Sequence, residues 1–362
     1  MKVRQICMMV LLGLGVIPAM QAQTFDKLWK EVKQAEKKSL PKTVIKLTDE
    51  IYQKGEKERN SAQMLKAYMW RMKTQDILTP DSFYVGLRDL EQWAKQTEQP
   101  MDRAILHSLI AEFYANYAAD NQWQLRQRTE IVGETPSADI REWTANMFVE
   151  KVRTNVKEAL ADSLLLLKTS SLNYIPFVEL GETSEYYHHD MYHLLASRAI
   201  RALNQIERLE RGSFNGITAS PVKQDISNIY ERMTDAYETA GLKEGYVLTM
   251  LQYLEWKRGN DNKLQPVQLK KGLGEWTADT YNAALDELKR QFKSEPICAE
   301  VYLAQVRYAV EKMQQVNALQ LCDEAIRLYP GYRRINALKN LREEILAVSY
   351  THLRAHETPE HL

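Results

Sequence analysis

The residues best suited to bind a metal are three histidines near the middle of the chain. His188, His189 and His193 lie in the string YYHHDMYH, and the last two have the four-residue spacing of helical zinc pairs. On the expected helix His188 falls on the apolar face, whereas His189 and His193 lie roughly 100–140° away. The three side chains therefore cannot meet at one metal. We favour a packed, hydrogen-bonded helix start with no cofactor; a two-histidine site completed by residues elsewhere is the alternative.

No catalytic motif accompanies these histidines. No glutamate follows His189 to act as the general base of a metalloprotease helix. Residues 298–301, Cys-Ala-Glu-Val, are similar to the Cys-x-Glu-Gln motif of internal thioesters, but Val301 stands where glutamine must supply the acyl group. The sequence also lacks a Gly-rich phosphate loop, a Gly-x-Ser-x-Gly elbow and a Cys-x-x-Cys pair. We expect a protein that is not an enzyme.

The cysteines are few, and we expect them to be structural. Cys7 belongs to the N-terminal segment, which leaves Cys298 and Cys322. If the chain turns near Gln314, these two lie at heights that differ by about 8 residues, or about 12 Å along antiparallel helices. A disulfide needs Cα atoms within about 7 Å. We therefore predict two buried free thiols that pack as small apolar residues.

The composition favours a helix-rich globular protein. The chain has 362 residues, of which 44% are hydrophobic and 27% charged, with only 14 Gly and 11 Pro. The formal net charge is zero, so no basic excess is present to release counterions from a nucleic acid. No polybasic block is present to bind an anionic membrane. We expect neither nucleic acid nor a membrane surface as partner.

Residues 1–22 have the composition of a secretory signal peptide. Lys2 and Arg4 form a basic start, an apolar run follows, and Pro18 precedes small residues suited to cleavage after Ala22. The apolar run is shorter than the ~20 residues of a membrane span. Cys7 lies at the start of this run rather than at its end, so we expect no lipid anchor. The prediction is export to the periplasm or cell envelope without a stable membrane anchor.

The last residues, 348–362, differ in character from the rest. They hold three of the seven histidines and show no apolar periodicity. The string VSYTHLRAHET resembles the translation of a transposase-type sequencing adapter. We therefore expect a non-native tail after residue 347, where the natural reading frame would continue beyond a fragment; a natural polar tail is the alternative.

Most of the remaining chain has the pattern of helices joined by short polar links. No long run shows the alternation of a β-strand, so we predict an all-α fold of stacked antiparallel helical hairpins, a TPR-like solenoid. Within it we expect a helical repeat-like domain at 23–257, a polar link at 258–275, and TPR-like hairpins that continue the stack at 276–347. Apolar residues recur at helical spacing over residues 24–38, 40–55, 61–75, 83–97, 100–119, 140–168, 185–211, 221–241, 244–257 and 276–292.

The clearest repeat signature lies in residues 299–332. Tetratricopeptide hairpins need small residues where the two helices touch and a proline where the next repeat begins. The second helix of this segment supplies Ala318, Cys322, Ala325 and then Pro330. In the first helix Val306 replaces the usual small residue. An ordinary helical hairpin with chance spacing is therefore the alternative.

Several strings resemble the N-terminal region of large bacterial proteins of the alpha-2-macroglobulin family. The resemblance extends over nearly all of the segment after the signal and includes no catalytic motif. It implies an envelope protein whose intact form traps or inhibits proteases or has a structural role, with β-sandwich domains further downstream. The strings are FDKLW at 25–29, LPKTVIKLTDEIYQK at 40–54, PSADIREW at 136–143, HDMYHLLASRA at 189–199 and YPGYRRINALKNL at 329–341.

Three hypotheses follow for the function. The first is a non-enzymatic helical N-terminal module of an exported macroglobulin-like protein, which docks on its own downstream domains or on an envelope partner and meets proteases through the intact protein. The second is a stand-alone periplasmic TPR-like scaffold that binds proteins or peptides. The third is a metal-dependent hydrolase that uses His189 and His193.

Overall fold

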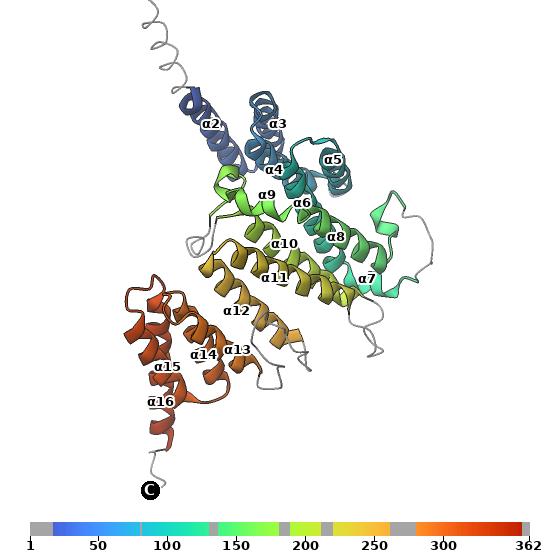
Figure 1. Ribbon diagram of the computed structural model, residues 1–362. Coiled ribbons are helices and arrows are strands. Elements are labelled where there is room, and N and C mark those ends of the chain that lie inside the picture. Colours follow the sequence, from blue (N-terminus) through green and yellow to red (C-terminus); the bar gives the residue numbers. More distant parts are fainter. Residues whose placement is uncertain are drawn as a thin grey trace, which may run out of the picture. The chain divides into compact units, whose positions relative to one another are not determined.

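The protein is all helical, as predicted. The computed structural model describes residues 17–79, 82–129, 137–180, 189–210, 220–260 and 280–356, and within these ranges it contains α-helices and short 3-10 turns but no strand. Consecutive helices pack against one another along most of the chain (Figure 1). The prediction of an all-α fold of stacked helical hairpins is therefore confirmed.

The chain divides into two compact units, residues 1–226 and 227–362. The division falls inside helix α11 (Pro221–Thr239). The polar link predicted at 258–275 lies outside the described residues from residue 261 onward, so its role as a boundary stays a prediction. The helices of the first unit are α2 (Ile17–Lys37), α3 (Pro41–Glu58), α4 (Ser61–Leu78), α5 (Ser82–Gln96), α6 (Pro100–Asp120), α7 (Gln122–Gln127), α8 (Ala145–Ala159), α9 (Ser163–Lys168) and α10 (Met191–Ile206).

Helix α6 is the central element of the first unit. Helices α2 to α6 pack in chain order, each against the next, and α6 then packs against both α8 and α10. Most turns of α6 are buried on more than one side, from Met101 in its first turn to Ala118 near its end. Because α6 is shared by these neighbours, it fixes where α5, α8 and α10 can lie.

Two expected helix limits in this unit are wrong. Gly55 does not end the second helix: α3 continues to Glu58, and Arg59 (φ 55°) then ends it in the left-handed region. Gly55 is instead a point of close approach, because a Cβ atom there would lie 2.9 Å from Cγ of Met64 on α4.

The long helix expected over residues 140–168 is likewise interrupted. Residues Ile140–Glu142 form a 3-10 turn, α8 ends at Ala159, and α9 begins anew at Ser163. The side chain of Asp162 accepts a hydrogen bond from the backbone N–H of Leu165 at 2.9 Å. This N-cap starts a second helix where apolar periodicity alone predicts a continuous one.

The second unit contains the helical hairpin predicted at residues 299–332. After the end of α11 come α12 (Lys243–Asn260), α13 (Thr280–Gln291), α14 (Cys298–Glu311), α15 (Gln315–Leu328) and α16 (Ile335–His356). The ring of Tyr230 on α11 stacks on that of Tyr253 on α12 with 5.0 Å between their centres, and α12 to α16 each pack against the next. The turn between α14 and α15 lies at Met313 (φ 59°) and Gln314. Ala318, Cys322 and Ala325 are fully buried, as the close approach of two helices requires.

At both ends of the chain, a described helix continues into a segment that we did not expect to be part of the folded domain. Helix α2 begins at Ile17, before the predicted cleavage point, and residues 1–16 of the predicted signal peptide lie outside the described residues. Helix α16 continues to His356, into the expected non-native tail. Within the described ranges, no helix has the length and apolarity needed to cross a membrane.

The close approach at Gly55 gives a test of the α3–α4 packing. We expect Gly55→Ala to destabilise the protein by about 1–3 kcal/mol, because the new Cβ must displace Met64 and meets the backbone oxygen of Asn60 at 3.3 Å. Gly259→Ala is the matched control on α12, where a Cβ meets nothing within 4 Å; it should be neutral or stabilise by up to about 1 kcal/mol. Urea unfolding followed by circular dichroism measures both. A Gly55→Ala protein as stable as the control would contradict the packing.

Candidate functional site

The histidine pair does not lie on one helix. Helix α10 begins at Met191, so the expected helix start near residue 185 is wrong for residues 189 and 190. The side chain of Asp190 caps the helix by accepting a hydrogen bond from the backbone N–H of His193 at 2.7 Å. His189 precedes the cap, and its carbonyl oxygen accepts a hydrogen bond from the N–H of Ser171 at 2.7 Å.

These positions do not make the helical metal pair of the third hypothesis. His188 lies outside the described residues. Among the side chains that the structure describes, no group of three His, Cys, Asp or Glu residues is placed to hold a metal ion. The described geometry therefore offers no set of protein ligands for His189 and His193 to complete.

The two cysteines are buried free thiols, as predicted. Burial raises the pKa of the Cys298 thiol, and it raises the pKa of the Cys322 thiol to about 11. The neighbouring Glu300 is buried, and its carboxylate oxygens accept hydrogen bonds from the hydroxyl of Tyr332 and from Arg334, each at 3.0 Å. Cys298 and Glu300 thus contribute to the packing of α14. Nucleophilic chemistry by the thiols of Cys298 and Cys322 is disfavoured at neutral pH.

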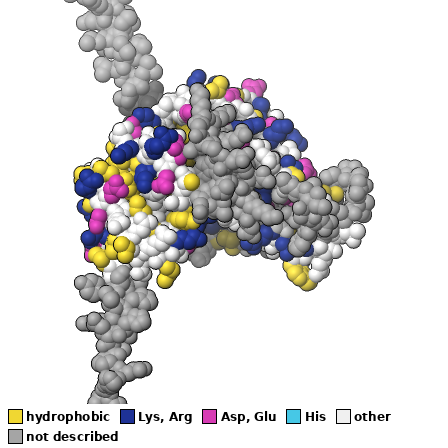
Figure 2. Space-filling view, turned by 60° about the horizontal axis from the view of Figure 1, so that its bottom comes forward, with side chains coloured by type: hydrophobic (Ala, Val, Ile, Leu, Met, Phe, Trp, Pro, Cys, Tyr) yellow, Lys and Arg dark blue, Asp and Glu magenta, His cyan; other side chains and the backbone are white. Residues whose placement is uncertain are grey.

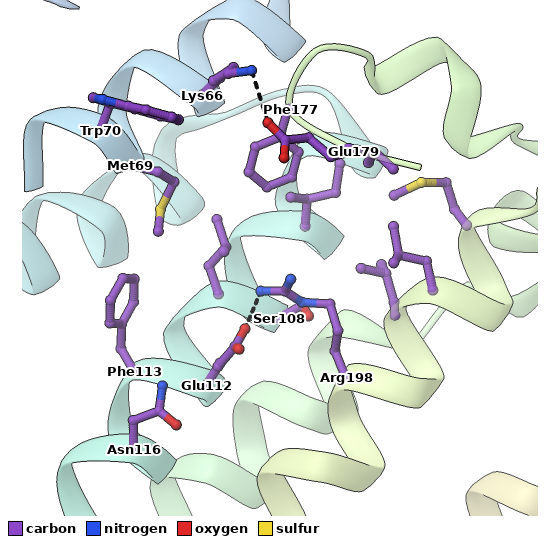
Figure 3. Close-up of a pocket in the computed structure, with 16 residues that line it drawn as sticks. Lys66, Met69, Trp70, Ser108, Glu112, Phe113, Asn116, Phe177, Glu179 and Arg198 are labelled. Carbon is purple, nitrogen blue, oxygen red and sulfur yellow. Dashed lines mark hydrogen bonds and ion pairs between the residues drawn. The ribbon is translucent and has the colours of Figure 1, made fainter. Parts of the chain in front are cut away.

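A cavity in the first unit is the strongest candidate for a binding site. Its volume is about 560 Å³, and it lies between α4, α6, α10 and the segment 177–179 (Figure 3). Its walls combine apolar and aromatic side chains with a few polar ones. The lining residues are Lys66, Met69, Trp70, Ile105, Ser108, Leu109, Glu112, Phe113, Asn116, Phe177, Val178, Glu179, Met191, Leu194, Leu195 and Arg198.

Helical spacing explains why these residues share one cavity. The lining positions on α6 follow one face of the helix, since they are separated by three or four residues from Ile105 to Asn116. The same spacing joins Lys66 to Trp70 on α4, and Met191 to Arg198 on α10. Helices α6 and α10 pack against each other, and α4, α6 and α10 each present one face to the same space.

The remaining wall is held in place by a buried carboxylate. Asp102, in the first turn of α6, accepts hydrogen bonds from the hydroxyl of Ser61 at 2.5 Å and from that of Tyr174 at 2.9 Å. Tyr174 ends a 3-10 turn, and the lining segment 177–179 begins three residues later. Asp102 thereby connects α4, α6 and this segment, and it fixes the position of Phe177 against the helices.

The charged side chains of the cavity form two ion pairs. At the floor, the guanidinium of Arg198 donates to the carboxylate of Glu112, and both side chains are about three-quarters buried. Burial lowers the pKa of Arg198 from its usual range, whereas the carboxylate of Glu112 acts in the opposite direction. At the rim, Nζ of Lys66 lies 3.2 Å from Glu179 and 5.1 Å from the centre of the Trp29 ring. These four charges sum to zero.

Two polar groups of the lining residues have no hydrogen-bond partner among the described residues, the hydroxyl of Ser108 and the indole N–H of Trp70. The hydroxyl of Ser108 is buried, with 5% of the residue exposed, and it makes no hydrogen bond to any described residue. Figure 3 places Ser108 beside Glu112 and Arg198 at the floor of the cavity. A buried hydroxyl without a partner is unfavourable, so a bound molecule would gain from a polar contact at Ser108.

Sequence reasoning missed this site, although one signal was present. Helical spacing of apolar residues was predicted over residues 100–119, and Ser108 and Glu112 interrupt the face formed there by Ile105, Leu109 and Phe113. Two polar residues within an apolar face, one of them ionisable, indicate a cavity or a partner.

Comparisons with known proteins assign no family to the chain. A scan against models of protein families gives no match, and a search of curated proteins gives no significant similarity.

The two thiols allow a direct test of their burial. In a Cys7→Ser chain at pH 8, we expect Cys298 and Cys322 to react with Ellman's reagent only slowly, because the thiolate is disfavoured and access is blocked. Unfolding in guanidinium chloride should release both thiols at once. Complete reaction of the folded chain within the mixing time would contradict their placement.

The unpartnered hydroxyl of Ser108 leads to a testable prediction for the stability of the protein. Ser108→Ala should leave the free energy of unfolding unchanged or raise it by up to about 1 kcal/mol, because it removes a buried group that has no hydrogen bond. Ser61→Ala is the contrasting variant, and it should cost about 1–3 kcal/mol by taking a partner from Asp102. Denaturant titration of both variants checks this. Equal losses in the two would show that Ser108 does make a stabilising contact.

Proposed function

We propose that the chain is a non-enzymatic helical module of an exported macroglobulin-like protein, and that its first unit binds a segment of a partner protein. The observation that carries this proposal is the cavity of about 560 Å³ between α4, α6 and α10. Its volume lies in the range of sites that enclose a compact ligand, and its mixture of apolar walls with few polar groups is typical of such sites.

The walls favour a protein segment as the occupant. Trp70, Phe113 and Phe177 supply aromatic surface from three different segments, and Met69 adds a flexible apolar side chain. Aromatic residues and methionine are enriched at the buried centres of protein interfaces. Because most lining residues belong to packed helices, the site needs little reorganisation on binding.

The charges also favour a protein partner. Acidic and basic side chains are interspersed on the coloured surface in Figure 2, and the full chain has a formal net charge of zero. A surface of this kind supports recognition by shape and by individual polar contacts more than attraction by a strong field.

The cellular context of the proposal comes from the sequence. Residues 1–22 have the pattern of a signal peptide, and the strings at 25–29, 40–54, 136–143, 189–199 and 329–341 resemble the N-terminal region of macroglobulin-family proteins. In this context the partner segment belongs to the downstream domains of the same protein or to an envelope protein, and the intact protein traps proteases or has a structural role. A stand-alone periplasmic scaffold is the competing function, supported by the TPR-like hairpin of α14 and α15.

Site-specific cross-linking tests the binding role. A photoreactive phenylalanine analogue is placed at Met69, inside the cavity, in the natural gene product expressed in its own envelope. The matched control is Ile77 on the same helix, which is 71% exposed and does not line the cavity. We expect the Met69 position, but not Ile77, to give one defined cross-link that mass spectrometry assigns to a single peptide. Absence of a cavity-specific cross-link would overturn the proposal.

The source DNA beyond the codon for Ala347 distinguishes the two functions. An open reading frame that encodes β-sandwich domains is expected for the macroglobulin-like protein. A stop codon at that point would exclude the macroglobulin-like module and favour the scaffold.

A further inference from the structure

Ser108 differs from buried helical hydroxyls such as those of Thr48 and Thr74. A serine or threonine inside a helix normally donates to the carbonyl one turn earlier. Thr48 and Thr74 do so, with hydrogen bonds of 3.0 Å to Val44 and 2.8 Å to Trp70. Ser108 makes no such bond. Thr249 in the second unit also has an unpartnered hydroxyl, but it does not line this cavity.

The ion pair beside Ser108 also has unused hydrogen-bonding capacity. Among the described residues, the only hydrogen-bond partner of the Arg198 guanidinium is Glu112, which it meets through one nitrogen and one carboxylate oxygen. A guanidinium has five N–H groups and a carboxylate has two oxygens. Several donors of Arg198 and one oxygen of Glu112 are therefore left for a ligand.

This set of groups is complementary to an amide. The guanidinium can donate to a carbonyl oxygen, the free oxygen of Glu112 can accept from an N–H, and the hydroxyl of Ser108 can do either. A carboxylate fits less well, since it would compete with Glu112 for Arg198 and would place two negative charges together. The neutral pair thus selects a neutral polar group.

The space next to these groups suits an apolar side chain. Figure 3 shows Met69, Trp70 and Phe113 along one side of the cavity and Phe177 beside Glu179. An amide at the floor with an apolar group among these four side chains would fill the cavity.

We infer that Ser108, Glu112 and Arg198 bind a backbone amide of a peptide whose large apolar side chain lies between Met69, Trp70, Phe113 and Phe177. The ligand is a neutral, internal stretch of polypeptide rather than a free chain end. This inference rests on the proposed binding function and adds the chemistry that the cavity recognises.

Three small probes separate the contributions of the amide and the apolar group. N-acetyl-L-tryptophan amide carries both, N-acetyl-L-tryptophan replaces the terminal amide by a carboxylate, and 3-methylindole has only the apolar ring. Saturation-transfer NMR with the full chain measures their relative affinities. We expect the amide to bind at least about fivefold more tightly than either of the others, the factor that one hydrogen bond supplies.

Two variants then locate the recognition group. Ser108→Ala should weaken binding of the amide by about fivefold and leave binding of 3-methylindole unchanged. Arg198→Lys keeps the charge but loses the planar fork, and it should have the same selective effect. Ser197→Ala on α10 is the matched control, because this serine is partly exposed and does not line the cavity; it should change neither affinity.

The outcomes separate this inference from the proposed function. Tighter binding of the carboxylate, or equal losses for the amide and 3-methylindole in Ser108→Ala, would overturn amide recognition. If no probe binds but the Met69 cross-link forms, the amide assignment fails and the binding function stands. If no probe binds and no cross-link forms, both fail.

Discussion

The burial of α6 on nearly all of its surface is the constraint on which the first unit depends. A helix whose apolar residues point in most directions must be covered by several neighbours, and α5, α8 and α10 provide this cover. Any polar side chain on such a helix must find a partner inside the protein or remain unsatisfied. Asp102 and Ser108 are both buried on α6. Asp102 has hydrogen-bond partners inside the protein, whereas the hydroxyl of Ser108 has none among the described residues.

Both carboxylate oxygens of Asp102 have hydrogen-bond partners, and these contacts position the neighbouring loop. Its carboxylate accepts hydrogen bonds from Ser61 on α4 and from Tyr174 in the 3-10 turn. Two backbone hydrogen bonds also hold this loop. The N–H of Ser171 donates to the carbonyl of His189, and the N–H of Met191 donates to the carbonyl of Thr169. These contacts bring a loop from between α9 and α10 onto α4 and α6, and they close the cavity on its fourth side.

Local patterns in the sequence were sufficient for most helices but not for the site. The α14–α15 hairpin was predictable because its small residues and its turn are adjacent in sequence. The break after α8 and the start of α10 were missed, because Asp162 and Asp190 act as N-caps inside segments whose apolar periodicity continues. The separation of His189 from His193 follows from that second cap. The cavity is lined by residues from the segments 66–70, 105–116, 177–179 and 191–198. No local sequence pattern predicts that these four segments meet.

The contrast between Asp102 and Ser108 argues that the cavity is more than a packing defect. A simple void inside a helical stack would be lined by apolar groups and would stay dry, whereas this one has a buried ion pair and an unpartnered hydroxyl at its floor. The hydroxyl could be replaced by a hydrogen atom without loss of any hydrogen bond within the described protein. Residues that lower stability without forming a contact are expected at functional sites, where the missing partner is the ligand. The same reasoning explains why Glu112 and Arg198 leave hydrogen-bonding capacity unused, although Asp102, only ten residues from Glu112, has partners on two other segments.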